Sequence, residues 1–282
     1  MASPVKISAI VLTYNEEAKI ANCLESLTGV ADEIVVVDSF STDNTEAICR
    51  RYNVRFVQHA YHGYTAQQNY ALDQVTYDHV LVLDADEWLS DELKASILAV
   101  KQNWDTEGGY KINRLNNFYG SWLRRGGAYP DAKVRLWDRR VARWGGEDPH
   151  GLVAIDKSKV KKLRGDLLHC SYAHIGEHIA QLNYYSQQSA KAKYKGGKRA
   201  NFFINLFISP VFRFIVNYIF RGGFLEGFHG FVYCSLASYL TLLKYVRLYD
   251  YNVNGLPPEK EVKPISKSAF DKQAAEMVRE PK

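Results

Sequence analysis

The stretch Val80-Leu81-Val82-Leu83-Asp84-Ala85-Asp86-Glu87-Trp88 decides how the rest of the chain is interpreted. Its run of apolar residues between polar ones is typical of a strand that is buried on both faces. Because side chains alternate along a strand, we expect Asp84 and Asp86 to leave its end on the same face. Two carboxylates placed in this way suit Mg²⁺ or Mn²⁺ better than zinc. The acids could instead cap the helix that begins at residues 90–92, although a helix needs only one cap.

Short apolar runs alternate with helical patterns upstream of this stretch. Strands are predicted at residues 7–12, 34–37 and 54–57, with helices between them and a further helix near residues 66–72. This alternation predicts an α/β fold with a mainly parallel central sheet flanked by helices. In such sheets, ligands bind outside the carboxyl ends of the strands.

Polar side chains stand at three of these strand ends. They are Thr13-Tyr14-Asn15, Asp38 and Asp84-Ala85-Asp86, and we expect them to converge on one cleft. The chain has neither the glycine-rich dinucleotide fingerprint nor a P-loop. An acid for the base or ribose and a cation for the pyrophosphate would suit a nucleoside diphosphate.

Composition sets broad limits on the chain. The 282 residues allow one substantial domain with an appendage, and the hydrophobic fraction of 46% supplies a core. The net charge is only +5, with the positive residues clustered after residue 157, and no nucleic-acid partner is expected. Four widely spaced cysteines and the lack of a secretory pattern at the start fit a cytoplasmic protein.

These motifs together resemble the family 2 glycosyltransferases with the GT-A fold. The resemblance rests on Thr13-Tyr14-Asn15-Glu16, on residues 38–43 and on Asp84-Ala85-Asp86. Later segments, at residues 167–172, 221–227 and 243–245, make the chain more narrowly similar to the WaaE/KdtX-type lipopolysaccharide core β-1,4-glucosyltransferases. The resemblance implies inverting transfer of a hexose, most simply glucose, from a UDP-sugar to a lipid-linked or lipopolysaccharide-core acceptor.

The resemblance also implies roles for individual residues. Asp86 and Asp84 would hold Mn²⁺ or Mg²⁺, and His169 is a further candidate ligand, although a lone histidine is as often structural. Gln68-Asn69 stands where many relatives have Arg-Asn, so a phosphate-binding charge is missing there. The nucleotide-sugar site would comprise Thr13, Tyr14, Asn15, Glu16, Asp38, Gln68, Asn69, Asp84 and Ala85.

The resemblance places the general base in the segment of residues 144–151. Relatives often have an acid directly after a histidine where this chain has His150-Gly151. Asp148 is therefore the leading candidate and Glu147 the second, because Pro149 restricts the backbone of Asp148. An ordinary turn explains the same residues. Aromatic and basic residues between positions 110 and 137, such as Trp122, Arg135 and Trp137, could contact the acceptor or could equally be core.

The chain changes character after residue 199, so we divide it into residues 1–199, 200–254 and a polar tail, 255–282. Residues 202–220 are apolar but contain Pro210 and Arg213, which makes a clean membrane span unfavourable. We expect helices that lie on an anionic membrane surface, at the cytoplasmic face of the bacterial inner membrane. A helical bundle or homo-oligomer surface would give the same pattern.

Two other functions stay open at this point. A non-catalytic nucleotide-sugar-binding or membrane-adaptor protein would explain Gly151 where an acid is expected. A sugar-nucleotide pyrophosphorylase is also α/β and uses a metal, but Thr13-Tyr14-Asn15 lacks the glycine-rich, basic first loop of those enzymes.

Overall fold

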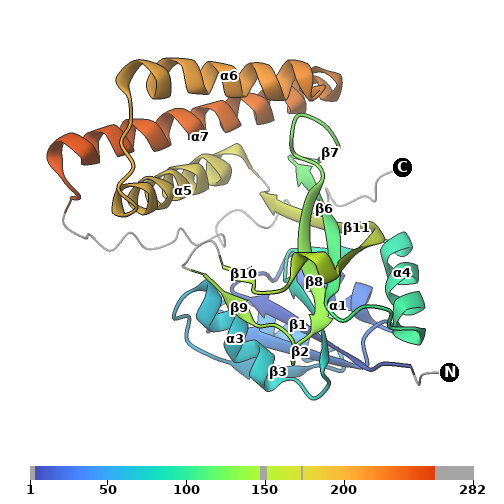
Figure 1. The fold of residues 1–282 in the computed structure, drawn as a ribbon. Coiled ribbons are helices and arrows are strands. Elements are labelled where there is room, and N and C mark those ends of the chain that lie inside the picture. Colours follow the sequence, from blue (N-terminus) through green and yellow to red (C-terminus); the bar gives the residue numbers. More distant parts are fainter. Residues whose placement is uncertain (1–3, 147–150, 173, 258–282) are drawn as a thin grey trace. The chain divides into compact units, whose positions relative to one another are not determined.

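The computed structural model describes residues 4–146, 151–172 and 174–257, which form two compact units (Figure 1). Among these residues, the first unit contains those up to Leu115 and Pro130–Ser171, and the second contains Asn116–Tyr129 and the residues from Tyr172 onward. The chain thus leaves the first unit twice.

A mixed sheet organises the first unit, in the order β3-β2-β1-β4-β8-β6-β11-β5. The strands β1 to β4 are parallel to one another, and β8 pairs with β4 in the antiparallel direction. β6 continues into the second unit, where it pairs with β7. The strands are β1 (Ile7–Thr13), β2 (Glu33–Asp38), β3 (Arg55–Gln58), β4 (His79–Asp84), β5 (Glu87–Leu89), β6 (Gly109–Phe118), β7 (Ser121–Leu123), β8 (Asp131–Asp138), β9 (Trp144–Gly145), β10 (Leu152–Val153) and β11 (Val160–Tyr172).

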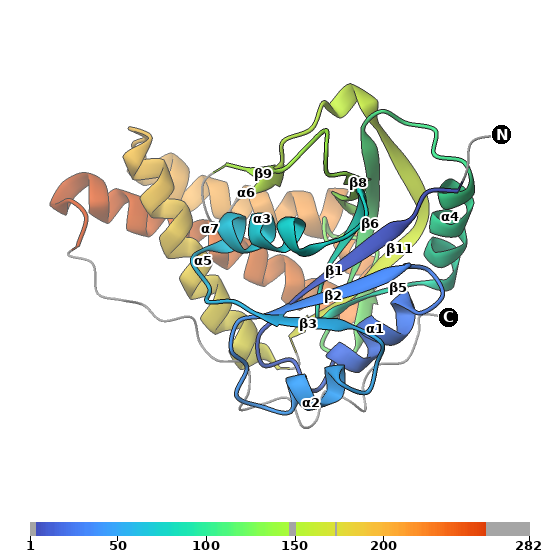
Figure 2. The same cartoon turned by 90° about the horizontal axis from the view of Figure 1, so that it is seen from below.

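Helices cover both faces of the parallel strands (Figure 2). They are α1 (Ile20–Leu27), α2 (Thr45–Cys49), α3 (Tyr64–Gln74) and α4 (Asp91–Gln102). Alternate residues of β4 enter separate cores: Leu81 and Leu83 pack with α1 and α4, whereas Val80 and Val82 pack with α3. This two-sided burial is the property that the apolar run predicts, and the predicted α/β fold with helices on both faces of the parallel strands is confirmed.

A serine, not the acids of the opening stretch, caps α4. The Ser90 side chain accepts a hydrogen bond from the backbone N–H of Leu93, at 3.3 Å, and one from that of Asp166, at 3.0 Å. The capping explanation for Asp84 and Asp86 is therefore wrong.

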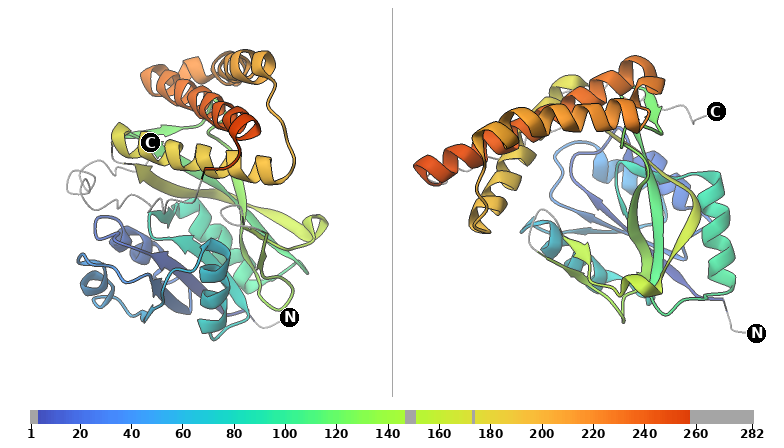
Figure 3. Two further views of the ribbon diagram at one scale, coloured as in Figure 1. Left: turned by 90° about the vertical axis from the view of Figure 1, so that its left-hand side faces the viewer. Right: turned by 45° about the horizontal axis from the view of Figure 1, so that its top comes forward.

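The second unit is helical. It contains α5 (Ile175–Lys195), α6 (Ser209–Ile215) between the π-helical turns Ile204–Ile208 and Val216–Phe220, a short 3₁₀ turn at Gly223–Glu226, and α7 (Gly227–Asn254). Another 3₁₀ turn, Lys157–Lys159, belongs to the first unit. Helices α6 and α7 run side by side (Figure 3). Helix α5 packs on α7 through Ala190, Leu248 and Tyr251, so it groups with the C-terminal helices. The division therefore differs from the boundary expected at residue 199.

Hydropathy gives a mixed result for these helices. No single helix in the described part of the chain is long and apolar enough to span a bilayer. One pair, Ile204–Phe220 with Gly223–Asn254, meets the length and composition together but is bent by 71°.

Candidate active site

The polar strand ends meet at the carboxyl edge of the parallel strands, as predicted. Thr13 lies beside Asp38 in the β1–β2 register, and Leu12 lies beside Asp84 in the β1–β4 register. The buried Thr13 hydroxyl has no hydrogen-bond partner among the residues described, whereas Tyr14 is 48% exposed. The edge therefore offers an unused hydroxyl and an aromatic ring to a ligand.

Asn15 joins the loops that follow β1 and β2. Its backbone N–H donates to the Ser41 hydroxyl at 2.8 Å, and its side-chain oxygen accepts from the Thr42 N–H at 2.8 Å. Both Asn15 and Phe40 have left-handed backbones, with φ of 53° and 63°, a conformation that is uncommon outside glycine. These hydrogen bonds hold the two loops in one arrangement, and direct contact of Asn15 with a nucleotide stays a prediction.

Asp38 and Glu16 already have protein partners. The fully buried Asp38 carboxylate accepts from the Ser41 N–H at 2.9 Å and from the Ser41 hydroxyl. Glu16 is also buried and pairs with Lys19 at 3.4 Å. Both acids support the loops at the edge, so a nucleotide contact by either would need a partner to be shared or exchanged.

Asp84 and Asp86 have different partners. β4 ends at Asp84, residues 85–86 form a turn, and β5 begins at Glu87, so the strand alternation does not extend to Asp86. The Asp84 side chain is 30% exposed and lies 3.2 Å from the Arg135 guanidinium. Asp86 is buried, with its carboxylate 3.6 Å from Nε2 of His169. Ala85 is buried as well, and its N–H donates to the carbonyl of Leu12 at 3.0 Å.

The pairing of β11 with β5 brings His169 to this turn. His169 lies opposite Glu87 in the antiparallel register, and the next residue, Cys170, donates its N–H to the Asp86 carbonyl at 3.1 Å. The structure thus brings together an acid and an imidazole that are far apart in the sequence. The role of His169 as a metal ligand stays a prediction.

A buried ion network that includes Asp84 was not predicted from the sequence. Arg135 on β8 lies 2.8 Å from Glu87 and 3.2 Å from Asp84, and Arg114 on β6 lies 3.4 Å from Glu87 and 2.6 Å from Asp131. Burial alone would lower the pKa of Arg135, but Glu87 and Asp84 raise it above its ordinary value. An arginine inside the apolar run Val134 to Trp137 is the signal that could have identified it, because an unpaired charge is rarely buried.

The first residue of α3, Tyr64, lies near Asp84. Burial and the nearby Asp84 raise the pKa of the Tyr64 phenol to about 12. Gln68 is fully buried one turn along the helix, so it supplies no exposed amide at the edge. The Asn69 amide instead binds the backbone of Trp144, donating to its carbonyl at 3.0 Å and accepting from its N–H at 3.1 Å. Nucleotide contacts by Gln68 and Asn69 stay predictions.

The candidate general bases, Asp148 and Glu147, lie outside the described residues. The glycine that follows this segment is described, and it packs tightly against α3. A Cβ atom at Gly151 would lie 2.5 Å from Oγ1 of Thr65 and 3.3 Å from Cδ1 of Tyr64. Close packing is therefore a physical reason for glycine where an acid is expected.

The residues proposed as an acceptor surface do not act as one group. Trp137 is fully buried and its indole N–H donates to the carbonyl of Ala142 at 3.0 Å, so it belongs to the core. Trp122 and Arg124 belong to the second unit, whereas Arg135 is in the ion network of the first.

The donor set at the turn fits a divalent cation only in part. No group of three or more acidic, histidine or cysteine side chains surrounds a common point in the described ranges. Asp86 and His169 supply an oxygen and a nitrogen, both of which Mn²⁺ accepts. Because Mg²⁺ is commonly bound through one or two carboxylates together with substrate phosphates and water, a small protein donor set is compatible with a cation that arrives with its nucleotide.

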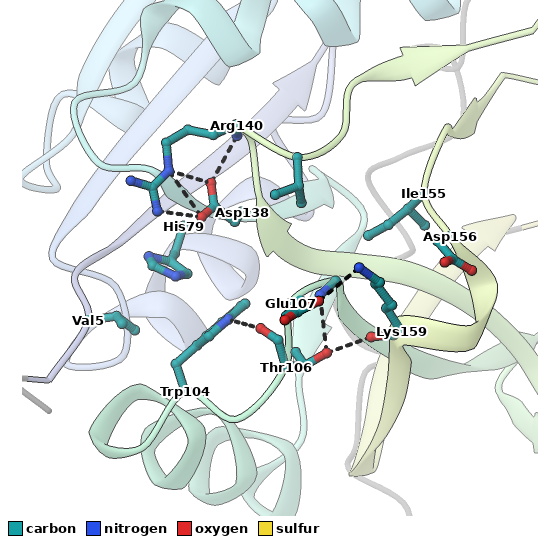
Figure 4. Close-up of a pocket in the computed structure, with 12 residues that line it drawn as sticks. Val5, His79, Trp104, Thr106, Glu107, Asp138, Arg140, Ile155, Asp156 and Lys159 are labelled. Carbon is teal, nitrogen blue, oxygen red and sulfur yellow. Dashed lines mark hydrogen bonds and ion pairs between the residues drawn. The ribbon is translucent and has the colours of Figure 1, made fainter. Parts of the chain in front are cut away.

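A cavity of the first unit lies at the opposite end of the strands. It has a volume of about 670 Å³ and is bordered by His79, at the start of β4, and by Asp138, at the end of the antiparallel β8. Its charged side chains neutralise one another, as in the Asp138–Arg140 pair at 2.6 Å and the Glu107–Lys159 pair at 2.8 Å (Figure 4). We therefore assign the chemistry to the carboxyl edge.

The family model and the sequence relatives both identify a glycosyltransferase. The model of the family described as "Glycosyl transferase family 2" matches residues 8–127. An uncharacterized glycosyltransferase of Rickettsia typhi is 30% identical over 258 residues, which cover 88% of this chain and 88% of the relative. The lipopolysaccharide core biosynthesis glycosyltransferase LpsC of Rhizobium meliloti is 28% identical over 256 residues, covering 89% and 94%. The solved mannosyltransferase PcManGT from Pyrobaculum calidifontis has a TM-score of 0.44 and 18% identity, covering 92% of this chain and 78% of its own.

Proposed function

The chain belongs to glycosyltransferase family 2, and we propose that it transfers a hexose, most simply glucose, from a UDP-sugar to a lipid-linked or lipopolysaccharide-core acceptor. Membership of this family makes the protein a glycosyltransferase, which disfavours both a pyrophosphorylase and a non-catalytic adaptor. The observation that carries the proposed donor is the carboxyl edge, where Thr13, Tyr14 and Asp84 stand at neighbouring strand ends.

Different residues at this edge would contact different parts of the donor. Tyr14 offers an exposed ring to the base, and the Thr13 hydroxyl offers a hydrogen bond that no described residue uses. Asp86 and His169 would hold Mn²⁺ or Mg²⁺ together with the diphosphate. When bound, the cation supplies positive charge for the departing nucleoside diphosphate.

Arg135 and Glu87 would keep Asp84 in place during the reaction. The Asp84 backbone N–H donates to the Glu87 carboxylate at 3.0 Å, and Arg135 contacts both acids. Glu87 and Arg135 would therefore fix the position of Asp84 relative to the donor. We retain Asp148, with Glu147 as the second candidate, as the base that takes the proton of the acceptor hydroxyl.

The acceptor is inferred from a relative. LpsC, which is named for lipopolysaccharide core biosynthesis, matches 89% of this chain, so the likeness includes the C-terminal helices as well as the sheet. An acceptor of this kind is attached to a lipid, which would bring the reaction to a membrane. We propose the cytoplasmic face of the bacterial inner membrane.

Calorimetric titration of UDP into the purified protein tests the donor site. The titration is run with Mn²⁺, with EDTA, and on Asp86→Ala. We expect binding that needs both the cation and Asp86, because that carboxylate is the buried acid beside His169. Radiolabelled UDP-glucose and a lipopolysaccharide core acceptor then test transfer.

The matched control for this titration is Glu107→Gln, which removes an 82%-exposed carboxylate near the opposite end of the sheet. Binding equal to that of the parent protein is expected. Metal-independent binding, or equal binding by folded Asp86→Ala, contradicts the proposed cation site. Tight binding of UDP without transfer to any acceptor would favour an adaptor, and Asp148→Ala activity equal to the parent would exclude that residue as the base.

A further inference from the structure

The second unit exposes an unusual density of large apolar side chains between residues 202 and 231. Phe203, Phe212, Phe220 and Phe228 are 71%, 64%, 79% and 73% exposed. Isolated exposed apolar residues are normal on a protein surface, but a continuous group marks an interaction site. We call the exposed residues of this group the apolar face; they are Phe202, Phe203, Ile204, Phe207, Ile208, Val211, Phe212, Ile215, Ile219, Phe220, Phe224, Leu225, Phe228 and Phe231.

The helical segment 204–220 is two-sided. Its exposed apolar residues recur three or four positions apart, as in Ile204, Ile208 and Phe212, and so form one stripe along the helix. Pro210 and Asn217 are buried on the other side, and the Pro210 carbonyl accepts a hydrogen bond from the Ser238 hydroxyl of α7 at 2.7 Å. Packing within the unit therefore uses the opposite side of the helix and leaves the stripe exposed.

The charges around this face have one sign. Residues 178–249 contain nine lysines and arginines and a single acid, Glu226. Arg199 and Lys198 precede the face, and the exposed Arg213 and Arg221 lie within it. Two copies of the chain joined through this face would bring like charges together, which opposes a homodimer.

We propose that the apolar face is a docking surface for an anionic lipid bilayer, in which the segment 204–220 lies in the plane of the headgroups. Phenylalanine and isoleucine side chains enter the boundary between headgroups and acyl chains, and the flanking cations remain among anionic phosphates. The two arginines and the 71° bend between the helices favour this arrangement over a span through the bilayer. The proposal concerns the second unit alone and does not depend on the reaction assigned to the first.

Flotation of the full-length protein with vesicles tests the proposal. One set contains phosphatidylcholine alone, and a second contains about 30 mol% phosphatidylglycerol. We expect the protein to float with the anionic vesicles and to be released by high salt. In the variant Phe207→Ser/Phe212→Ser/Phe220→Ser, we expect at least a tenfold loss of the bound fraction, roughly as the loss of three large apolar side chains implies.

Two control variants separate the contributions of apolar contact and charge. Leu98→Ser/Val141→Ser removes exposed apolar side chains from the first unit and should float like the parent. Lys198→Gln/Arg199→Gln should lose the preference for anionic vesicles. Circular dichroism of the triple variant checks that the fold is retained, as expected for exposed positions.

Three outcomes would overturn the proposal. The triple variant could float as well as the parent, or the parent could stay at the bottom with anionic vesicles. The parent could also form a dimer in lipid-free solution that the triple variant loses, which would assign the face to a second copy of the chain. Because flotation needs neither donor nor acceptor, its failure is distinguishable from failure of the proposed reaction.

Discussion

The two units distribute their side chains in opposite ways. The first unit buries charge: Arg135, Glu87 and Lys19 are each less than 5% exposed. The second unit exposes aromatic rings, with Phe203 and Phe220 more than 70% exposed. Both patterns reverse the usual partition between core and surface. In the first unit ion pairs compensate the buried charge, whereas in the second the apolar side chains face away from the unit's own core.

The difference indicates that each unit has a surface suited to a different kind of ligand. Buried charges at a sheet edge are useful when an ionic ligand must be held without competition from solvent, because electrostatic interactions strengthen in a low-dielectric site. Exposed aromatic side chains are useful when the partner is itself apolar. The predictions below test whether each reversal is a property of its own unit.

Arg135→Met is expected to have the largest effect. The substitution removes the cation that contacts both Glu87 and Asp84 and leaves Glu87 buried without its nearest partner. Breaking a buried pair from one side costs about 3–5 kcal/mol. Urea unfolding should show this loss in the free energy of unfolding, and UDP binding should weaken because Asp84 is no longer anchored.

The double variant Glu87→Gln/Arg135→Met is the matched control, because it removes the uncompensated charge together with its partner. It should recover a substantial part of the lost stability. If Arg135→Met alone is as stable as the parent, the network is not a stabilising feature of the first unit and the contrast between the units fails.

Much of the first unit could be predicted from the sequence because its signals are local. The apolar run before Asp84 and the polar residues after β1 and β2 are enough to predict a parallel sheet and the edge at which its ligand binds. The role of Asn15 as a link between two loops depends on distances between loops that no local pattern contains.

The remaining differences have a common physical origin. Arg135 and Glu87 come together only because β8 pairs with β4 and β5 pairs with β11, and the sequence specifies neither antiparallel pairing. The alternation rule also fails at Ala85, because a turn replaces the strand there. In the second unit the apolar composition was evident, but only the structure shows that Phe212 faces outward while Asn217 is buried.

His178 predicts a pH-dependent stability of the second unit. Burial lowers the pKa of this histidine to about 4, and its Nδ1 lies 2.9 Å from the Tyr119 hydroxyl. The folded pKa is below the unfolded value of 6.5. The contribution of His178 to the free energy of unfolding is therefore fully present above about pH 6.5 and is lost as the pH drops toward 4. We expect a loss of about 2–3 kcal/mol across this window.

Chemical denaturation at a series of pH values checks this prediction, followed through the helical signal in far-UV circular dichroism. In His178→Gln the contribution from this window should disappear, since glutamine keeps the polar contact to Tyr119 but does not titrate. A parent protein whose stability is flat between pH 6.5 and 4 would show that His178 is accessible to protons in the folded state, and would weaken the case for a closed core in the second unit.

Gly230→Ala tests how tightly the second unit is packed away from its apolar face. A Cβ atom at this position would overlap the carbonyl oxygen of Gly223, and a Cβ atom at Gly223 would itself lie 2.7 Å from Sγ of Cys234. Overpacking of this kind costs about 1–3 kcal/mol. Thermal unfolding should show the loss, whereas Gly176→Ala in α5, which meets no atom within 4 Å and has no positive φ, should show no loss.

Phe40→Gly is expected to have the smallest effect. It tests the contrast between the units because Phe40 is an exposed aromatic residue in the first unit, whose unusual feature is buried charge. Its ring is 53% exposed and its φ is 63°. Glycine adopts this conformation without steric penalty, so the variant should be more stable by about 1 kcal/mol, whereas Phe40→Ala should change stability little. Urea unfolding measures the stability of both variants.

If glycine destabilises the protein, the Phe40 ring makes packing contacts through its buried part. If glycine stabilises the fold while weakening UDP binding, then Phe40, like Tyr14, is an aromatic side chain that the first unit keeps exposed for a ligand, and the two units differ in the kind of partner that their exposed rings bind.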